Sequence, residues 1–292
     1  MSSPNRAARR HPERHFDVYP ATTLAWMHAG NTAGVFTDSL WDMAMFDAAH
    51  QQMFVRGGRI SSQSSPRLAA ARCAIVREFL KLPPETEYLL FMDSDMSCPA
   101  DTPYRMIASA KANDADILGG LCFVGGRGTQ GMYPTIYALS MDPEQAVKFN
   151  VSPIVRYPMG GVIGCDATGG AALLIHRRVL VKMGQKFGRN PDGSVNPTPW
   201  FADGVHMGAE FGEDVVFCIR ARQLGFRVAV DTAIQFGHQK EYTLDEELYR
   251  LHLQLTGGED LKAAEDAPDV EDGLFDIAGP IRDMTVQEPV DA

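Results

Sequence analysis

The sequence predicts an α/β fold, in which short apolar strands follow amphipathic helices along the chain. Residues 88–92 (YLLFM) are an almost wholly apolar run with the length of one buried strand. The preceding residues 65–81 carry apolar side chains at helical spacing. A second such unit pairs a helix predicted over 215–224 with a strand over 226–230. Repeated units of this kind are typical of a sheet covered by helices.

The N-terminal elements have local signals that set their ends. Residues 22–27 (TTLAWM) predict a first strand, and the mainly apolar face of residues 37–50 predicts a helix. Two glycines followed by SSQSS predict a loop over residues 57–64. The helix over 65–81 then starts with a serine N-cap and a proline, and two prolines follow its end.

Length and composition are those of an ordinary globular protein, with 292 residues, 45% apolar and 22% charged. No run of about 18 apolar residues occurs, and the N-terminus lacks the apolar segment of a signal peptide. We therefore expect a cytoplasmic protein without a membrane partner. The five cysteines show no metal-ligand or redox spacing, which favours reduced thiols.

The net charge of −10 is concentrated at the C-terminus. Residues 256–292 carry a net charge of −9, which leaves about −1 for the rest of the chain. The charge of the body therefore neither favours nor excludes an anionic partner such as nucleic acid. We expect a disordered basic tail over residues 1–15, one domain over 16–255 and an acidic tail over 256–292.

Two carboxylates follow the strand over residues 88–92. Asp93 and Asp95 lie where that strand must reach the surface, and ligands of open α/β sheets bind at the carboxyl ends of the strands. Two aspartates at such an edge can bind a hard divalent cation, which in turn can bind a diphosphate. The alternative is that both residues cap the helix that follows or shape a turn.

An arginine interrupts the apolar face of the helix over residues 65–81. Arg72 lies between Leu68 and Ile75 on that face. A guanidinium group in such a place needs an anion or several carbonyl partners. We expect Asp93 or a bound phosphate to pair with Arg72; the alternative is a side chain that extends past its apolar neighbours to solvent.

Three later segments carry further candidates. Gly169 and Gly170 allow close approach of backbone or ligand. Trp200 lies at a loop edge, where it could stack on a sugar or pack over the core. Glu213 and Asp214 open a helix, a placement that the helix dipole alone would explain.

Three features follow one another along the chain: Asp93-x-Asp95, the helix start at Asp214 and the downstream His238. Their order resembles that in nucleotide-sugar glycosyltransferases of the GT-A fold. The resemblance is to family-two-like members, and the helix-then-strand unit SPRLAAARCAIVREFL…EYLLFMDSDM is most similar to the bacteriophage-encoded branch. It covers residues 20–245. It implies a single GT-A (Rossmann-like) domain, with a mixed, mostly parallel central sheet flanked by helices.

The resemblance also implies roles for the site residues. Asp95 would bind Mn²⁺ or Mg²⁺, Asp93 would contact the metal or the ribose, and His238 would be a further metal ligand. Asp214 would be the base at the acceptor, and Arg72 would lie on the donor side. The family commonly has asparagine after that arginine, where this chain has a cysteine.

The acceptor and donor sites complete the expected site. We expect Gly169 and Gly170 at the donor, and Trp200 and Glu213 at the acceptor. The co-substrate would be a UDP- or GDP-sugar. The acceptor would be a hydroxyl of a protein or of DNA, a virion protein or modified phage DNA in the host cytoplasm if the chain is phage-encoded. The sequence predicts no particular oligomeric state for this chain.

The chemistry explains these residue types. A divalent cation neutralises the charge that develops on a leaving diphosphate, and a carboxylate can accept the proton of the acceptor hydroxyl. A helix start stabilises the ionised form of Asp214 but lowers its basicity. Two alternatives stay open: a nucleotidyltransferase, for which the first strand lacks a glycine-rich basic loop, and a glycosyltransferase-like binding module without turnover.

Overall fold

The fold is known from a computed structural model that describes residues 19–63, 67–125, 132–141, 149–206, 209–240 and 250. The chain divides into two units, residues 1–241 and 242–292, and all the elements below belong to the first. Both predicted tails lie outside the described residues. No helix within the described ranges is long and apolar enough to cross a membrane.

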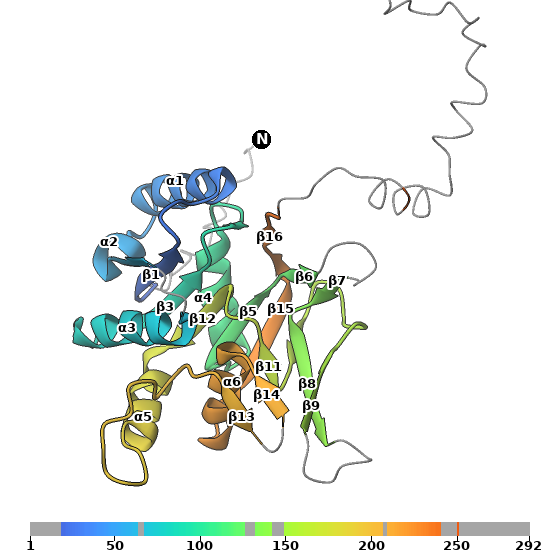
Figure 1. Cartoon of the computed structure of the whole chain (residues 1–292). Coiled ribbons are helices and arrows are strands. Elements are labelled where there is room, and N and C mark those ends of the chain that lie inside the picture. The colour runs from blue at the N-terminus through green and yellow to red at the C-terminus, as the bar shows by residue number, and fades with distance from the viewer. Residues whose placement is uncertain are drawn as a thin grey trace, which may run out of the picture. The chain divides into compact units, whose positions relative to one another are not determined.

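A seven-stranded sheet forms the centre of the fold (Figure 1). Its strand order is β10-β15-β5-β12-β3-β1-β2. Strand β1 runs parallel to β2 and β3, and β15 runs parallel to β5, whereas β12 is antiparallel to both its neighbours and β10 is antiparallel to β15. The predicted α/β class with a mixed, mostly parallel sheet is thus confirmed. The strands are β1 (Ala21–His28), β2 (Arg59–Gln63), β3 (Thr86–Met92), β5 (Ile117–Leu121), β10 (Val162–Gly164), β12 (Ala172–His176) and β15 (Val228–Gln235).

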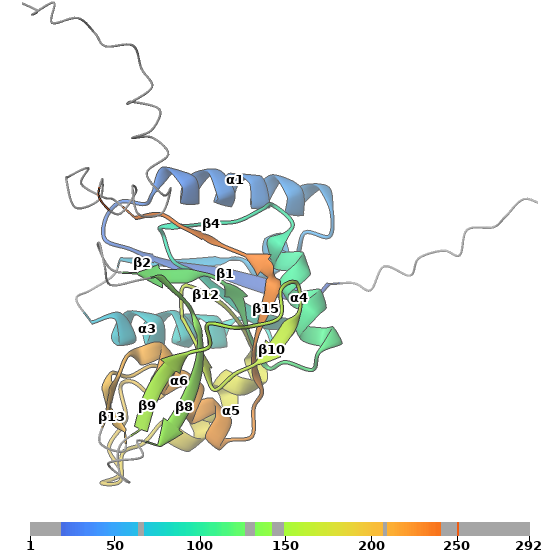
Figure 2. The ribbon, with the colours of Figure 1, turned by 90° about the vertical axis from the view of Figure 1, so that its right-hand side faces the viewer.

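Helices cover both faces of this sheet, as Figure 2 shows for α1 and α3 on opposite sides. Side chains of α3, α5 and α6 pack in one core cluster, and those of α1, α2 and α4 pack in another. Strand β3 supplies both, because Leu89 and Phe91 point to the first cluster and Leu90 and Met92 to the second. The helices are α1 (Gly34–Ala49), α2 (Met53–Gly57), α3 (Leu68–Lys81), α4 (Thr102–Ala112), α5 (Arg177–Phe187) and α6 (Glu213–Gln223).

Four small sheets complete the described part of the chain. One joins the hairpin β8–β9 to β11, and the others are two-stranded. The pair β4–β16 is the most important for the site, because it brings the end of the domain to the turn after β3. The strands are β4 (Met96–Ser97), β6 (Phe123–Gly125), β7 (Met132–Pro134), β8 (Ile136–Met141), β9 (Phe149–Pro153), β11 (Ala167–Thr168), β13 (Gly204–His206), β14 (Ala209–Phe211) and β16 (Gly237–His238).

The predicted loop over residues 57–64 is wrong in part, because residues 59–63 form the edge strand β2 beside β1. This strand reads RISSQ, and its one apolar side chain is Ile60. An edge strand with largely polar exposed side chains lacks the apolar run that identifies a buried strand. Gly57 ends the preceding helix against β1, where a Cβ atom would lie 2.1 Å from the Thr22 carbonyl oxygen.

Candidate functional site

The turn that follows β3 holds both aspartates at the carboxyl edge of the sheet. The amide of Asp93 donates to the carbonyl of Ala171 (2.8 Å), and the amide of Met96 donates to the carbonyl of Asp93 (3.0 Å). These bonds fix the turn beside the start of β12. The carboxylates of Asp93 and Asp95 keep 31% and 37% of their surface exposed, so both remain open to a ligand.

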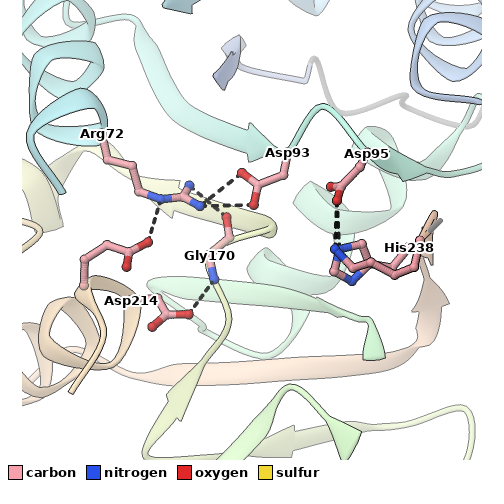
Figure 3. A network of polar contacts seen from close by, with 8 residues as sticks. Arg72, Asp93, Asp95, Gly170, Asp214 and His238 are labelled. Carbon is pink, nitrogen blue, oxygen red and sulfur yellow. Dashed lines mark hydrogen bonds and ion pairs between the residues drawn. The ribbon is translucent and has the colours of Figure 1, made fainter. Parts of the chain in front are cut away.

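Asp95 contacts two basic side chains from the end of the domain. Its Oδ2 lies 3.1 Å from Nε2 of His238 and 3.0 Å from Nζ of Lys240 (Figure 3 shows the histidine contact). The amide of Gln239 donates to the carbonyl of Asp95 (2.8 Å), and β16 pairs with β4 directly after the aspartate turn. Residues 143 positions apart are therefore joined through both side chain and backbone.

Hydrogen bonds shift the pKa values of Asp95 and His238. Partial burial acts to raise the pKa of Asp95, but the bonds from His238 and Lys240 outweigh it and lower the pKa to about 2. The bond to Asp95 raises the pKa of His238, and burial opposes that shift. Nδ1 of His238 lies 2.9 Å from the carbonyl oxygen of Phe123. Both ring nitrogens face oxygen acceptors, so the two hydrogen bonds together require a proton on each nitrogen; binding of a cation by Nε2 would require loss of the Nε2 proton.

Arg72 connects the aspartate turn to helix α6. Its side chain is fully buried in the structure, and the guanidinium donates to Oε1 of Glu213 (3.2 Å), the carbonyl of Gly170 (3.0 Å) and Oδ1 of Asp93 (3.0 Å) (Figure 3). It also lies over the ring of Phe91, 5.1 Å from the centroid. The expected pairing with Asp93 is confirmed, and the alternative in which Arg72 extends to solvent is wrong.

The two acids that Arg72 binds are themselves buried in part. Burial raises the pKa of Asp93, against the opposing effect of the Arg72 charge. Burial also raises the pKa of Glu213, with the neighbouring Asp214 charge as the next cause. The charge of the guanidinium acts against burial at both acids and favours their ionised forms.

Asp214 lies at the start of α6 and faces Gly170. One carboxylate oxygen accepts from the amide of Gly170 (3.2 Å), as Figure 3 shows. The other accepts from the amide of Val215 (2.8 Å). Helix α6 places its positive end at this carboxylate. Because Gly170 also accepts from Arg72, one peptide segment connects the predicted base to the aspartate turn.

Three of the predicted contacts do not fit this geometry. Glu213 was expected at the acceptor, but its carboxylate is buried and is bound by Arg72. Gly169 and Gly170 were expected at the donor, but protein atoms fill the space beside them. A Cβ atom on Gly170 would lie 2.9 Å from Cζ of Arg72, and one on Gly169 would lie 3.1 Å from Cβ of Thr135. These glycines allow close packing within the protein.

Trp200 was also expected at the acceptor, and the structure places it in the core instead. Only 6% of its surface is exposed, and its indole nitrogen donates to the carbonyl of Leu180 (2.7 Å). The next residue, Phe201, stacks on Phe217 of α6 with ring centroids 4.5 Å apart. The two aromatics therefore anchor their loop between α5 and α6 and do not form a sugar platform.

Sequence reasoning missed Lys240, although a signal was present. Alternate residues of an extended segment project to the same side, so Lys240 follows His238 toward Asp95. The pairing of Glu213 with Arg72 spans 141 positions and had no comparable local signal.

A divalent cation at this edge of the sheet would have two protein ligand atoms, and substrate and water would have to complete its shell. No group of three or more histidine, cysteine or acidic side chains that could hold a metal occurs among the described residues. Asp95 and His238 supply one oxygen and one nitrogen at one place. Asp93, the other expected ligand, is held by Arg72. Magnesium sites commonly use one or two carboxylates together with substrate phosphates and water, and imidazole suits manganese.

Comparisons with known proteins give a fold likeness at low similarity. No family model matches the chain, and no curated protein sequence matches it. Among solved structures, A197 from STIV has a TM-score of 0.46 at 12% identity, over 75% of this chain and 86% of that one. The structure of GalNAc-T7 with UDP, GalNAc and Mn²⁺ has a TM-score of 0.46 at 11% identity, over 75% of this chain and 44% of that one. Likeness at this level carries no conclusion about activity.

Proposed function

We propose that this chain is a metal-dependent glycosyltransferase of GT-A type, which moves a sugar from a nucleoside-diphosphate donor to a hydroxyl acceptor. The observation that carries the proposal is the contact between Asp95 and His238 at the carboxyl edge of the sheet. A carboxylate and an imidazole that lie 143 positions apart in the sequence meet where ligands of α/β sheets bind. A surface ion pair alone would not need the backbone bonds that hold both segments in place.

The residues divide the chemistry between them. Asp95 and His238 would hold Mn²⁺ or Mg²⁺, which supplies positive charge to the leaving diphosphate. Asp93 keeps part of its carboxylate exposed beside Arg72, so it can accept a hydrogen bond from a ribose hydroxyl. Arg72 fixes the orientation of Asp93 and, through Gly170, of the segment that contacts Asp214.

Asp214 is the residue that we assign to proton transfer. In an inverting reaction the acceptor oxygen forms a bond to the anomeric carbon while the bond to the diphosphate breaks. The diphosphate takes the bonding electrons, and Asp214 takes the hydroxyl proton. Its carboxylate accepts hydrogen bonds from the backbone amides of Gly170 and Val215, which fix its orientation. We propose a protein or modified DNA as the source of the acceptor hydroxyl, met in the host cytoplasm by a bacteriophage-encoded enzyme.

A calorimetric titration tests the proposal. UDP and GDP are titrated into the protein with and without Mn²⁺, and we expect binding of one of them only with the metal. Asp95→Ala should abolish both this binding and turnover of the matching nucleotide sugar. Asp42→Ala, on the exposed face of α1, is the control and should retain both. Absence of metal-dependent binding of any nucleoside diphosphate to the wild-type protein would refute the proposal.

One observation favours a second candidate, a nucleotide-binding module without turnover. The ammonium group of Lys240 already balances the charge of Asp95, so this carboxylate is satisfied without a metal. Donor hydrolysis in the absence of acceptor separates the two candidates. An enzyme should release nucleoside diphosphate slowly from its donor, whereas a binding module should leave the donor intact for as long as it stays folded.

A further inference from the structure

Lys240 contacts the same carboxylate oxygen that would bind a cation. Its Nζ lies 3.0 Å from Oδ2 of Asp95, and Nε2 of His238 lies 3.1 Å from that same atom. An ammonium group at this distance occupies the space in which a cation bound to that oxygen, and shared with the imidazole, would lie. Lys240 and a divalent cation therefore compete for one place.

The backbone keeps Lys240 at this place. The amide of Gln239 donates to the carbonyl of Asp95 (2.8 Å), one residue before the lysine. The side chain itself is 41% exposed, and a lysine stem has four rotatable bonds with no fixed donor geometry. The ammonium group can therefore leave Asp95 for a nearby anion while its backbone stays in position.

The carboxylate that pairs with Lys240, Asp95, is itself partly exposed, in contrast to the buried surroundings of the other site cation, Arg72. The guanidinium of Arg72 is buried and is held by Asp93, Glu213 and Gly170. A diphosphate that arrives at Asp95 would bring two or more negative charges within reach of the lysine. An ammonium group binds phosphate as a point charge.

We propose that Lys240 is a counter-cation that leaves Asp95 for the donor diphosphate, so that metal and nucleotide bind cooperatively. This inference rests on the proposed function. Without nucleotide, the ammonium group competes with the metal for Asp95 and weakens metal binding. With nucleotide, it binds the phosphates, and the metal enters beside His238. Each ligand then raises the affinity for the other by the same factor, as linkage requires.

The experiment measures Mn²⁺ binding directly, by electron paramagnetic resonance of the free ion at one fixed pH. Lys240→Met should bind Mn²⁺ alone about three- to fivefold more tightly than wild type, the range expected from removing a partly exposed ion pair. In a calorimetric titration with saturating Mn²⁺, the same variant should bind UDP or GDP about tenfold more weakly than wild type, because a charged hydrogen bond to phosphate is lost. Lys240→Arg should stay near wild type in both measurements.

The opposite signs distinguish this role from a structural one. A lysine that only supports the fold would weaken both kinds of binding on replacement, and that result would overturn the inference, as would two unchanged affinities. Lys186→Met, an exposed lysine of α5, should change neither affinity, and thermal unfolding checks that each variant is folded. Failure of the proposed function has a different pattern, in which wild type itself shows no nucleotide-dependent Mn²⁺ binding.

Discussion

Replacement of Arg72 by methionine tests the account of the buried charge cluster. Methionine keeps most of the length of the side chain but removes every hydrogen bond that the guanidinium donates. Glu213 and the carbonyl of Gly170 are then left buried without this donor, while Asp93 is open enough to recover water. Breaking a buried ion pair from one side costs about 3 to 5 kcal/mol, and we expect a loss in that range.

This loss is large against the whole stability of a domain, which is about 5 to 15 kcal/mol. For a domain of this size it corresponds to a fall of roughly 6 to 20 °C in the midpoint of thermal unfolding. Urea unfolding followed by circular dichroism gives the free energy directly. The control is Arg77→Met on the same helix, whose exposed guanidinium bonds the carbonyl of Pro197, and we expect it to cost less than about 1 kcal/mol.

A double-mutant cycle locates the origin of the loss. Glu213→Gln in the Arg72→Met background removes the uncompensated buried charge. The double variant should therefore lose less unfolding free energy than the two single variants lose in sum. If the free energy of unfolding of Arg72→Met is within about 1 kcal/mol of the wild-type value, the ion pairs of Arg72 with Asp93 and Glu213 do not form in solution. The account of the site as one connected cluster would then fail.

Further predictions concern the supports of the site. The buried carboxylate of Asp47 accepts hydrogen bonds from the first amides of α2 and from a tyrosine hydroxyl. Asp47→Ala should lower the free energy of unfolding in urea by about 2 to 3 kcal/mol. A loss below about 0.5 kcal/mol would contradict a stabilising role for these bonds. Gly57→Ala, which pushes a Cβ atom into β1, should cost about 3 kcal/mol or more, whereas Gly34→Ala meets no atom within 4 Å and should be nearly neutral. The folded pKa of Asp95 is lowered to about 2, so its ionic contacts add stability above its unfolded pKa of about 3.9 and lose it as the pH falls toward 2. The difference in thermal stability between wild type and Asp95→Asn should therefore shrink between pH 4 and 2, and a constant difference would count against these contacts.

Much of the sheet could be predicted from the sequence because its central strands are buried. The apolar run at residues 88–92 and the helix end at Lys81 are both as expected. Arg72 was informative for the same reason, since a charge in an apolar face needs a partner, and Asp93 is that partner. By contrast, β2 lies at the sheet edge and carries polar side chains, so its sequence matches a loop as well as a strand.

The candidate site could be predicted only as a set of residues. Asp95 and His238 meet as expected, but the partner of Glu213 depends on how α3 and α6 pack, which local patterns do not encode. Whether Trp200 contacts a ligand or packs in the core could not be predicted from the sequence either. An aromatic residue in a loop rich in glycine and proline suits a ligand or a core equally, and only the neighbouring helices decide between them.

The distances along the chain between these partners have a consequence for synthesis. Arg72 leaves the ribosome 141 positions before Glu213, and Asp95 leaves it 143 positions before His238. At translation rates of roughly 5 to 20 residues per second, the early half waits about 7 to 28 seconds for the late half. During that interval the nascent guanidinium must remain hydrated, so a fragment that ends before α6 should not bury Arg72 and should be a substrate for chaperones.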